Sequence, residues 1–507
     1  SPDGERLAVT ARGEIFSVPV EEGVTLPVTR GSGARESWAG FGPEGKRLVF
    51  VTDEPREEEI RTVDAWGRGE PGVVKPAGES GWHFPPLFSP DGKWIAYADQ
   101  TQTLYVVPAG GGEPRVVDRS EQWEISRYAW SPDSRWLAYD KTARNDYNSV
   151  YVYDTKEQKV HRITGDETED YSPAWDPKGR FLYFLSDRTT NPLLGSRDLR
   201  DINIKPTKPY LVLLRADVEN PFAELAGRPP GDDEKEGDKD ADEGKDKKKG
   251  KKDDKDPEAE KEKDEVEPVE IEFDGLAERI AAFPVDPGQY GALSATEKKV
   301  FYVSAPLQGM ADEPPFFAEP APTASLIGFD LEEKEAKPFV EGISAYGLAR
   351  KADKLFVMKR RGEIYVVGAA APPGPDMAES RVSLDGVVIE LDPLEEWAQI
   401  YYEGWRHMRD FYWDAGLGNL DWDQIRDQYA TLLPRLSTRD DLRDLRGEVI
   451  GELSTSHTYV FGGDAATSTP RVPTGMLGAD MVREGDFFRV ERIYRGAAPD
   501  EERSPLL

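Results

Sequence analysis

The sequence predicts a mainly β fold with an α-helical segment: a seven-bladed β-propeller, then helices, then the start of a further domain. Three observations lead to this prediction. A phrase made of a turn and a strand recurs along the first 380 residues. The spacing of apolar residues changes from two to about 3.6 after residue 393, and short strands return near the C-terminus.

The repeated phrase is a polar turn followed by an apolar run. A clear copy is Ser89-Pro90-Asp91-Gly92, followed by the run Ile95-Ala96-Tyr97. Proline fixes φ at the second turn position, aspartate caps the turn through its side chain, and glycine accepts a positive φ. The prolines of five clear copies stand at positions 2, 43, 90, 132 and 177, and two degraded copies begin at Ser294 and Arg350.

A repeat of about 40 to 45 residues that contains several strands is typical of a propeller blade. Seven copies therefore predict seven blades within residues 1–380. The first copy begins at Ser1 and lacks a preceding strand, so the closure of the ring stays open at this stage. Because Ser1 already lies inside a repeat, the natural N-terminus is expected to be absent, together with any signal peptide.

One long interruption separates the fifth and sixth copies. Residues 232–265 contain 17 Asp or Glu and 11 Lys, with no aromatic residue. Such a segment cannot bury enough apolar surface to offset the entropy lost on ordering. Residues 229–268 are therefore predicted to form a disordered, charged insertion within a blade.

Residues 390–465 are predicted to be helical. Trp397, Tyr401 and Trp405 share one face of a first helix, and a second helix ends at Pro434. A third helix is expected from about residue 439 to 453, with Ser437 as the candidate N-cap because Asp440 follows it three residues later. The aromatic and leucine stripes of these helices are interpreted as core rather than as cofactor contacts.

Composition narrows the classes of function. The net charge of −32 argues against a nucleic-acid partner, because phosphate contacts need clustered Lys and Arg. The chain has no cysteine, which excludes disulfides and thiolate metal sites. The sequence contains no apolar run of about 18 residues, so no membrane span is predicted. No motif predicts a cofactor or a metal site.

One of the four histidines has a distinctive context. His457 follows the third predicted helix in the segment Gly451-Glu452-Leu453-Ser454-Thr455-Ser456-His457-Thr458-Tyr459. A helix C-terminus favours a cation, and a loop beside small hydroxyl residues can aim an imidazole. Histidines at helix ends more often only cap carbonyl groups, so the residues alone leave both readings open. The other histidines, His83, His161 and His407, are interpreted as structural or surface residues.

These segments together resemble the tricorn protease family, the propeller-bearing branch of the C-terminal-processing serine peptidases. The resemblance covers nearly the whole chain. Its most specific parts are Glu395-Glu396-Trp397 through Trp405-Arg406, Phe411-Tyr412-Trp413-Asp414, Asp421-Trp422, Tyr429, Gly451 through Tyr459, and Gly462-Gly463-Asp464. By this resemblance His457 is the general base and Ser456 the hydroxyl that helps to orient it.

The resemblance also implies a mechanism and a domain order. The activity would be acyl transfer on peptide substrates, with the propeller (residues 1–380) limiting access to a helical catalytic subdomain (390–465). Residues 472–507 would be the truncated start of a PDZ-like domain. The nucleophile would lie in a later domain, so the fragment is expected to be inactive. A homo-oligomer, a hexamer in the family, and a cytoplasmic location are implied, with a periplasmic or secreted location not excluded.

Two rival interpretations remain. A non-enzymatic propeller scaffold similar to TolB would explain the repeats but gives no reason for the Ser456-His457 segment. An enzyme similar to prolyl oligopeptidase would carry a Gly-x-Ser-x-Gly elbow in an α/β-hydrolase domain directly after the blades. Predicted helices stand there instead.

Overall fold

The computed structural model describes residues 1–507 except 32, 77–80, 191, 195–200, 224–265, 308–322, 350–353, 360–361, 464–476 and 496–503. The chain divides into two compact units, Ser1–Arg426 and Asp427–Leu507. Each unit is described by itself. The predicted disordered insertion falls almost entirely outside the described residues.

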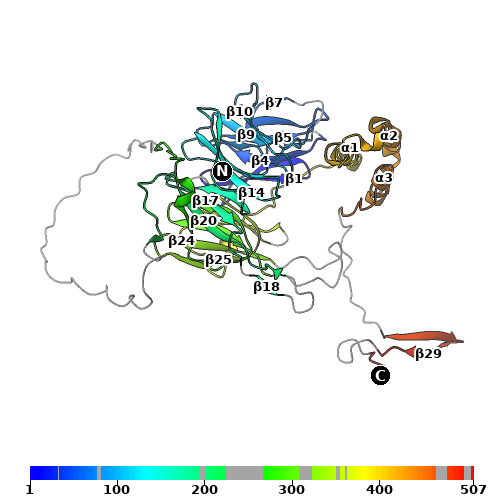
Figure 1. Ribbon diagram of the computed structural model, residues 1–507. Coiled ribbons are helices and arrows are strands. Elements are labelled where there is room, and N and C mark those ends of the chain that lie inside the picture. The colour runs from blue at the N-terminus through cyan, green and yellow to red at the C-terminus, as the bar shows by residue number, and fades with distance from the viewer. Residues whose placement is uncertain are drawn as a thin grey trace, which may run out of the picture. The chain divides into compact units, whose positions relative to one another are not determined.

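The first unit contains the propeller sheets (Figure 1). Its first three sheets are antiparallel and have the strand orders β1-β2-β3, β4-β5-β6-β7 and β11-β10-β9-β8. Their strands are β1 (Arg6–Ala11), β2 (Glu14–Pro19), β3 (Leu26–Pro27), β4 (Glu36–Phe41), β5 (Arg47–Thr52), β6 (Glu59–Asp64), β7 (Gly72–Lys75), β8 (Leu87–Phe88), β9 (Trp94–Ala98), β10 (Thr103–Pro108) and β11 (Arg115–Arg119).

The next three sheets have the strand orders β12-β13-β14-β15, β16-β17-β20-β21 and β22-β23-β24-β25-β26-β27. A separate two-stranded sheet, β18-β19, lies between β17 and β20 in the chain. The strands are β12 (Tyr128–Trp130), β13 (Trp136–Thr142), β14 (Asn148–Asp154), β15 (Lys159–Arg162), β16 (Asp170–Trp175), β17 (Phe181–Ser186), β18 (Leu193–Leu194), β19 (Asp201–Ile202), β20 (Lys208–Leu213), β21 (Ile280–Ala282), β22 (Tyr290–Ala295), β23 (Lys299–Ser304), β24 (Ala324–Asp330), β25 (Glu335–Leu348), β26 (Lys354–Lys359) and β27 (Ile364–Gly368).

In the described copies that follow a strand, the repeated phrase forms the turn that joins the first two strands of a blade. In the third sheet Ser89 Oγ donates to Asp91 Oδ1 at 2.6 Å, and Gly92 N donates to Ser89 O at 2.9 Å. Gly92 has a φ of +71°, a conformation that side chains with a Cβ rarely adopt. The turn therefore has the structure that its residue types predict.

The prediction of seven blades is wrong: the described residues form six propeller sheets. The reason is β25, which at 14 residues is long enough to serve two hairpins. Its first part pairs with β24, from Glu335↔Asp330 onward, and its second part pairs with β26, ending at Leu348↔Leu355. The strands β26 and β27 that follow the seventh copy therefore extend the sixth sheet instead of starting another.

The ring closes between the first and the last sheet. Phe16 and Val18 of β2 pack in one cluster with Ile364 and Val366 of β27. Lys354 Nζ donates to Gly4 O at 3.5 Å in the same region. The closure that the sequence left open is thus made by side chains some 350 residues apart in the chain.

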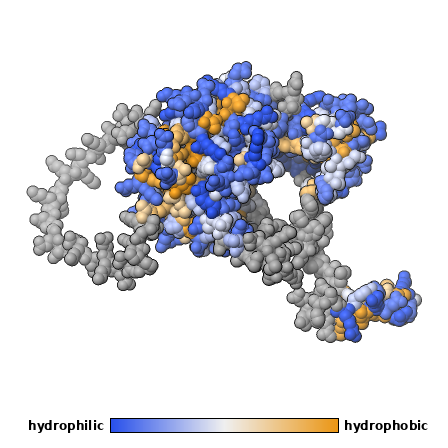
Figure 2. All heavy atoms as spheres, viewed as in Figure 1, coloured by the Kyte–Doolittle hydropathy of each residue, from blue (hydrophilic) through white to orange (hydrophobic). Residues whose placement is uncertain are grey.

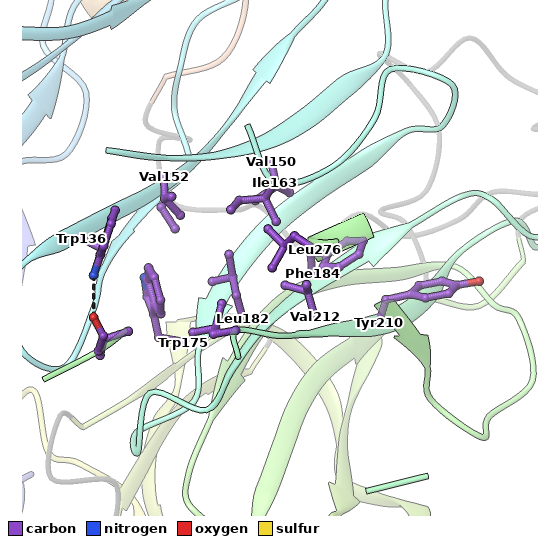
Figure 3. Packing of buried hydrophobic residues seen from close by; sticks show 13 residues of the cluster. Trp136, Val150, Val152, Ile163, Trp175, Leu182, Phe184, Tyr210, Val212 and Leu276 are labelled. Carbon is purple, nitrogen blue, oxygen red and sulfur yellow. Dashed lines mark hydrogen bonds between the residues drawn. The ribbon is translucent and has the colours of Figure 1, made fainter. Parts of the chain in front are cut away.

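Neighbouring sheets pack face to face through buried apolar clusters. The cluster in Figure 3 joins the fourth and fifth sheets through residues such as Trp136, Val152, Leu182 and Val212. The Trp136 indole N–H donates to Val269 O at 2.9 Å, and Figure 3 draws this bond as a dashed line. Val269 lies just after residues 224–265, so this bond joins the next described part of the chain to the fourth sheet.

The helices follow the propeller in the chain. They are α1 (Pro393–Phe411), α2 (Trp422–Ala430) and α3 (Arg439–Gly451). Short 3-10 turns lie at Leu276–Arg279 before β21, at Ala378–Ser380 after β27, and at Leu417–Asn419 and Leu433–Arg435 between the helices. Tyr401 and Trp405 are buried, in line with the predicted apolar face of the first helix. The N-cap of α3 is Thr438 rather than Ser437, and it forms a capping box with Asp441.

The second unit ends in an antiparallel hairpin of β28 (Ala479–Glu484) and β29 (Phe487–Ile493). Phe487 and Phe488 are 79% and 69% exposed, and Figure 2 shows apolar residues on the surface of this hairpin. None of the helices in the described ranges combines the length and the apolar character needed to cross a bilayer.

Candidate active site

The helix α1 is held against loops of the propeller within the first unit. The loop between β5 and β6 supplies Asp53, whose carboxylate accepts hydrogen bonds from Arg406 Nη2 and from Gln399 Nε2 at 3.1 Å. Arg406 Nη1 donates to Arg56 O at 2.6 Å. Both Asp53 and Arg406 are only 7% exposed, so this is a buried, charge-assisted contact.

A second ion pair lies beside it. Arg409 Nη1 and Nη2 donate to the two carboxylate oxygens of Glu57 at 2.6 and 2.9 Å. Burial by itself lowers the pKa of the Arg409 guanidinium, but the hydrogen bonds to Glu57 and Asp410 outweigh burial and raise that pKa. The propeller loop therefore contributes carboxylates, and α1 contributes the arginines that bind them.

A pocket of about 230 Å³ lies between the first turn of the propeller and the start of α1. Its two arginines form ion pairs: Arg12 with Glu396 at 2.8 Å, and Arg35 with Glu403 at 3.1 Å. Burial acts to raise the pKa of Glu403, but His407, Arg35 and Gln399 together lower it. Within the described residues no group of three or more acidic or histidine side chains could hold a metal ion.

Two tryptophans join α1 to α2. Trp405 Nε1 donates to Trp422 O at 2.8 Å, and Trp422 Nε1 donates to Trp405 O at 3.1 Å. Tyr401 OH donates to Arg426 O at 2.7 Å. Trp422, which the sequence places on the apolar stripe of the second predicted helix, thus makes a reciprocal contact with Trp405 that packs the two helices.

His457 lies in the second unit, in the turn that follows α3, and its side chain is exposed. Its φ is +64°, and that of Ser454 is +50°. The turn is tied internally, because Thr455 Oγ1 donates to Leu453 O at 3.1 Å and Thr458 Oγ1 donates to Thr455 O at 3.0 Å. Leu453 is buried and anchors the start of the turn.

Ser456 is also exposed and adjoins His457. The His457 ring meets the Tyr459 ring edge-on at 6.5 Å, and no hydroxyl in the described part of the chain hydrogen-bonds to the imidazole. The arrangement is an imidazole open to solvent, able to accept a proton from a group brought to it. A buried ring packed in apolar side chains would have excluded that chemistry.

The other histidines have local partners. His83 is 1% exposed, and its backbone N–H donates to Glu58 at 2.6 Å. His161 is half-buried rather than on the surface, and it stacks on Phe273 at 3.9 Å, with burial lowering its pKa. His407 lies on α1 against Trp82, with ring centroids 4.3 Å apart. Only His457 combines exposure with a strained turn.

Fold and site define the class of this chain: a β-propeller joined to a helical segment that presents an imidazole to solvent. The model of the tricorn protease second β-propeller domain matches residues 1–369, and that of the tricorn protease C1 domain matches residues 393–451. The chain belongs to the tricorn protease family, as its sequence motifs predict.

Curated tricorn proteases are similar to this chain over almost all of its length. Tricorn protease homolog 1 of Streptomyces coelicolor is 30% identical over 100% of this chain and 46% of the relative. The tricorn protease of Thermoplasma volcanium is 24% identical over 99% of this chain and 45% of the relative. The crystal structure of the tricorn protease superposes with a TM-score of 0.80 at 22% identity, covering 99% of this chain and 45% of that one. The chain thus spans about half the length of the relatives it matches.

Proposed function

We propose that this chain supplies the general base and the access-controlling propeller of a serine-type peptidase. The observation that carries the proposal is the exposed imidazole of His457, next to Ser456, at the end of a helical segment of the tricorn C1 type. Residues 390–465 would be the catalytic subdomain, and the hairpin β28-β29 the start of a PDZ-like domain.

The proposed chemistry is acyl transfer. His457 takes the proton of a serine hydroxyl while the serine oxygen bonds to the peptide carbonyl carbon. The C–N bond then breaks, and the imidazolium returns the proton to the leaving amine. Water, activated by the same imidazole, forms the acid product and frees the serine. Ser456 would orient the ring.

The nucleophile is proposed to come from a later domain of the complete gene product; in support, none of the hydroxyl groups among the described residues hydrogen-bonds to the His457 imidazole. The 507-residue chain alone is therefore expected to turn over no fluorogenic peptide. Turnover by the chain alone that His457→Ala abolishes would show that this chain carries its own nucleophile.

The decisive experiment uses the complete gene product that contains these residues. His457→Ala is expected to lower kcat on a fluorogenic peptide by about 10³-fold or more, because loss of the base removes the activation of the nucleophile. His407→Ala, on α1 beside Trp82, is the matched control for loss of an imidazole and should stay within about threefold of the unmodified enzyme. Full activity of the His457→Ala enzyme would show that His457 is not the base. It would then favour the interpretation of this chain as a non-enzymatic propeller scaffold.

The propeller is proposed to limit access to short or unfolded chains. The closed ring of six sheets supports this role, because the blades of a propeller surround a central channel. The complete gene product should cleave an unstructured peptide much faster than the same sequence held within a folded domain. Equal rates would contradict gating by the propeller.

A further inference from the structure

The end of α3 carries a negative charge where a helix favours a positive one. Glu452 is the C-cap of α3, and Glu448 lies one turn before it. No basic side chain stands in the last turn of the helix. A helix C-terminus has partial negative charge, and like charges four residues apart repel each other. Glu452 therefore destabilises α3 locally and must be held by something else.

That partner is Tyr429 of α2. The Tyr429 hydroxyl donates to Glu452 Oε1 at 2.6 Å, a contact across 23 residues within the second unit. The hydrogen bond to Glu452 is also the main cause that raises the pKa of Tyr429 to about 12. The bond ties the end of α2 to the end of α3 and offsets the unfavourable position of the carboxylate.

The turn that carries His457 begins directly after Glu452. Leu453, next to Glu452, is 7% exposed, and Ser454 and His457 both have positive φ. Such a conformation is unfavourable for a residue with a Cβ, and it persists only where the surroundings enforce it. The hydrogen bonds of Thr455 and Thr458 tie the turn internally. The backbone N–H groups of Leu453 and Ser454 donate to Ile450 O at 3.1 Å and to Gly451 O at 3.0 Å at the end of α3. The bond between Glu452 and Tyr429 adds a side-chain contact from the start of the turn to α2.

We propose that Tyr429 is a positioning residue for His457: its hydroxyl holds Glu452 and so fixes the turn that presents the imidazole. The proposal rests on the proposed function. Tyr429 acts through Glu452, so its loss should change how often the imidazole is correctly placed and leave substrate binding alone.

The kinetic test is Tyr429→Phe in the complete gene product, which removes only the hydroxyl. We expect kcat to fall about three- to tenfold, with KM within about twofold, as for loss of one partly exposed hydrogen bond to a charged group. Glu452→Ala should reproduce this loss. Glu452→Gln keeps an oxygen acceptor for the tyrosine and should restore kcat to within about twofold. The Tyr429→Phe and Glu452→Ala double variant should be no slower than either single variant, because both remove the same contact.

A second readout does not depend on activity. Amide hydrogen exchange of residues 453–458 should accelerate about three- to tenfold in Tyr429→Phe. The control is Thr431→Val, which removes a hydroxyl bonded to Gln428 O at 2.7 Å and should leave this exchange unchanged.

The outcomes separate the two proposals. Unchanged kcat in Tyr429→Phe overturns the positioning role, whether or not the exchange accelerates. Unchanged exchange also overturns it, even if His457→Ala abolishes activity. Full activity of His457→Ala overturns the proposed function itself, and the exchange experiment then still reports whether Tyr429 holds the turn.

Discussion

Replacing Arg406 by Met tests the attachment of α1 to the propeller. Methionine keeps most of the aliphatic stem but removes the donors to Asp53 and to Arg56 O. Asp53 remains 7% exposed and keeps two donors, Arg35 N at 2.6 Å and Gln399 Nε2 at 3.1 Å. Removing one partner of a buried ion pair costs about 3–5 kcal/mol. The two remaining donors place the expected loss at the lower end, about 3 kcal/mol.

The assay is native-state hydrogen exchange of the amides of α1. A loss of about 3 kcal/mol raises the opening equilibrium of α1 about 100-fold, since each 1.4 kcal/mol is a factor of ten. The matched control is Arg443→Met on α3, because its partner Asp440 is 76% exposed. An exposed pair contributes at most about 1 kcal/mol, so exchange there should change less than about fivefold. An Arg406→Met change below fivefold would refute the assignment of a buried, stabilising pair.

The double variant tests the physical cause. If the cost comes from leaving the Asp53 carboxylate without its cation, adding Asp53→Asn to Arg406→Met removes that charge. The double variant should then recover about 2 of the 3 kcal/mol, because replacing both partners of a buried pair is often nearly neutral. A double variant less stable than Arg406→Met would contradict the reasoning.

Two further changes probe the propeller. Trp136→Phe removes the donor to Val269 O and should lower the free energy of unfolding by about 1–3 kcal/mol in urea titrations, whereas the same change at Trp123, which is 62% exposed, should have little effect. At Asp187 burial raises the pKa, so the folded state disfavours the carboxylate. A raised folded-state pKa lowers stability once the carboxyl group is ionised. Asp187→Asn should therefore raise the urea midpoint of unfolding at pH 7. This gain should disappear below about pH 4, where Asp187 is protonated in the unfolded state as well. A gain that persists at pH 3 would point to a cause other than charge.

The sequence alone predicted the features that depend on neighbours along the chain. The turn at Ser89–Gly92 follows from the φ preferences of its residues, and the buried face of α1 follows from apolar residues such as Tyr401 and Trp405 at helical spacing. The Ser456-His457 segment was identified by its motif, because a short motif is read without tertiary contacts. Family membership followed from the same local patterns.

The tertiary structure decided what depends on residues far apart in the chain. The seven repeats could be counted in the sequence. Only strand pairing shows that the two halves of β25 belong to two hairpins of one sheet, so that seven repeats form six sheets. Pairs such as Asp53 with Arg406 and Tyr429 with Glu452 carry no mark in the sequence. In the sequence, many carboxylates could pair equally well with many arginines or tyrosines. Only the folded backbone brings two particular side chains within hydrogen-bonding distance. The sequence singled out His457 as the proposed base, and only the folded chain shows that Tyr429 and Glu452 form a hydrogen bond at the start of its turn.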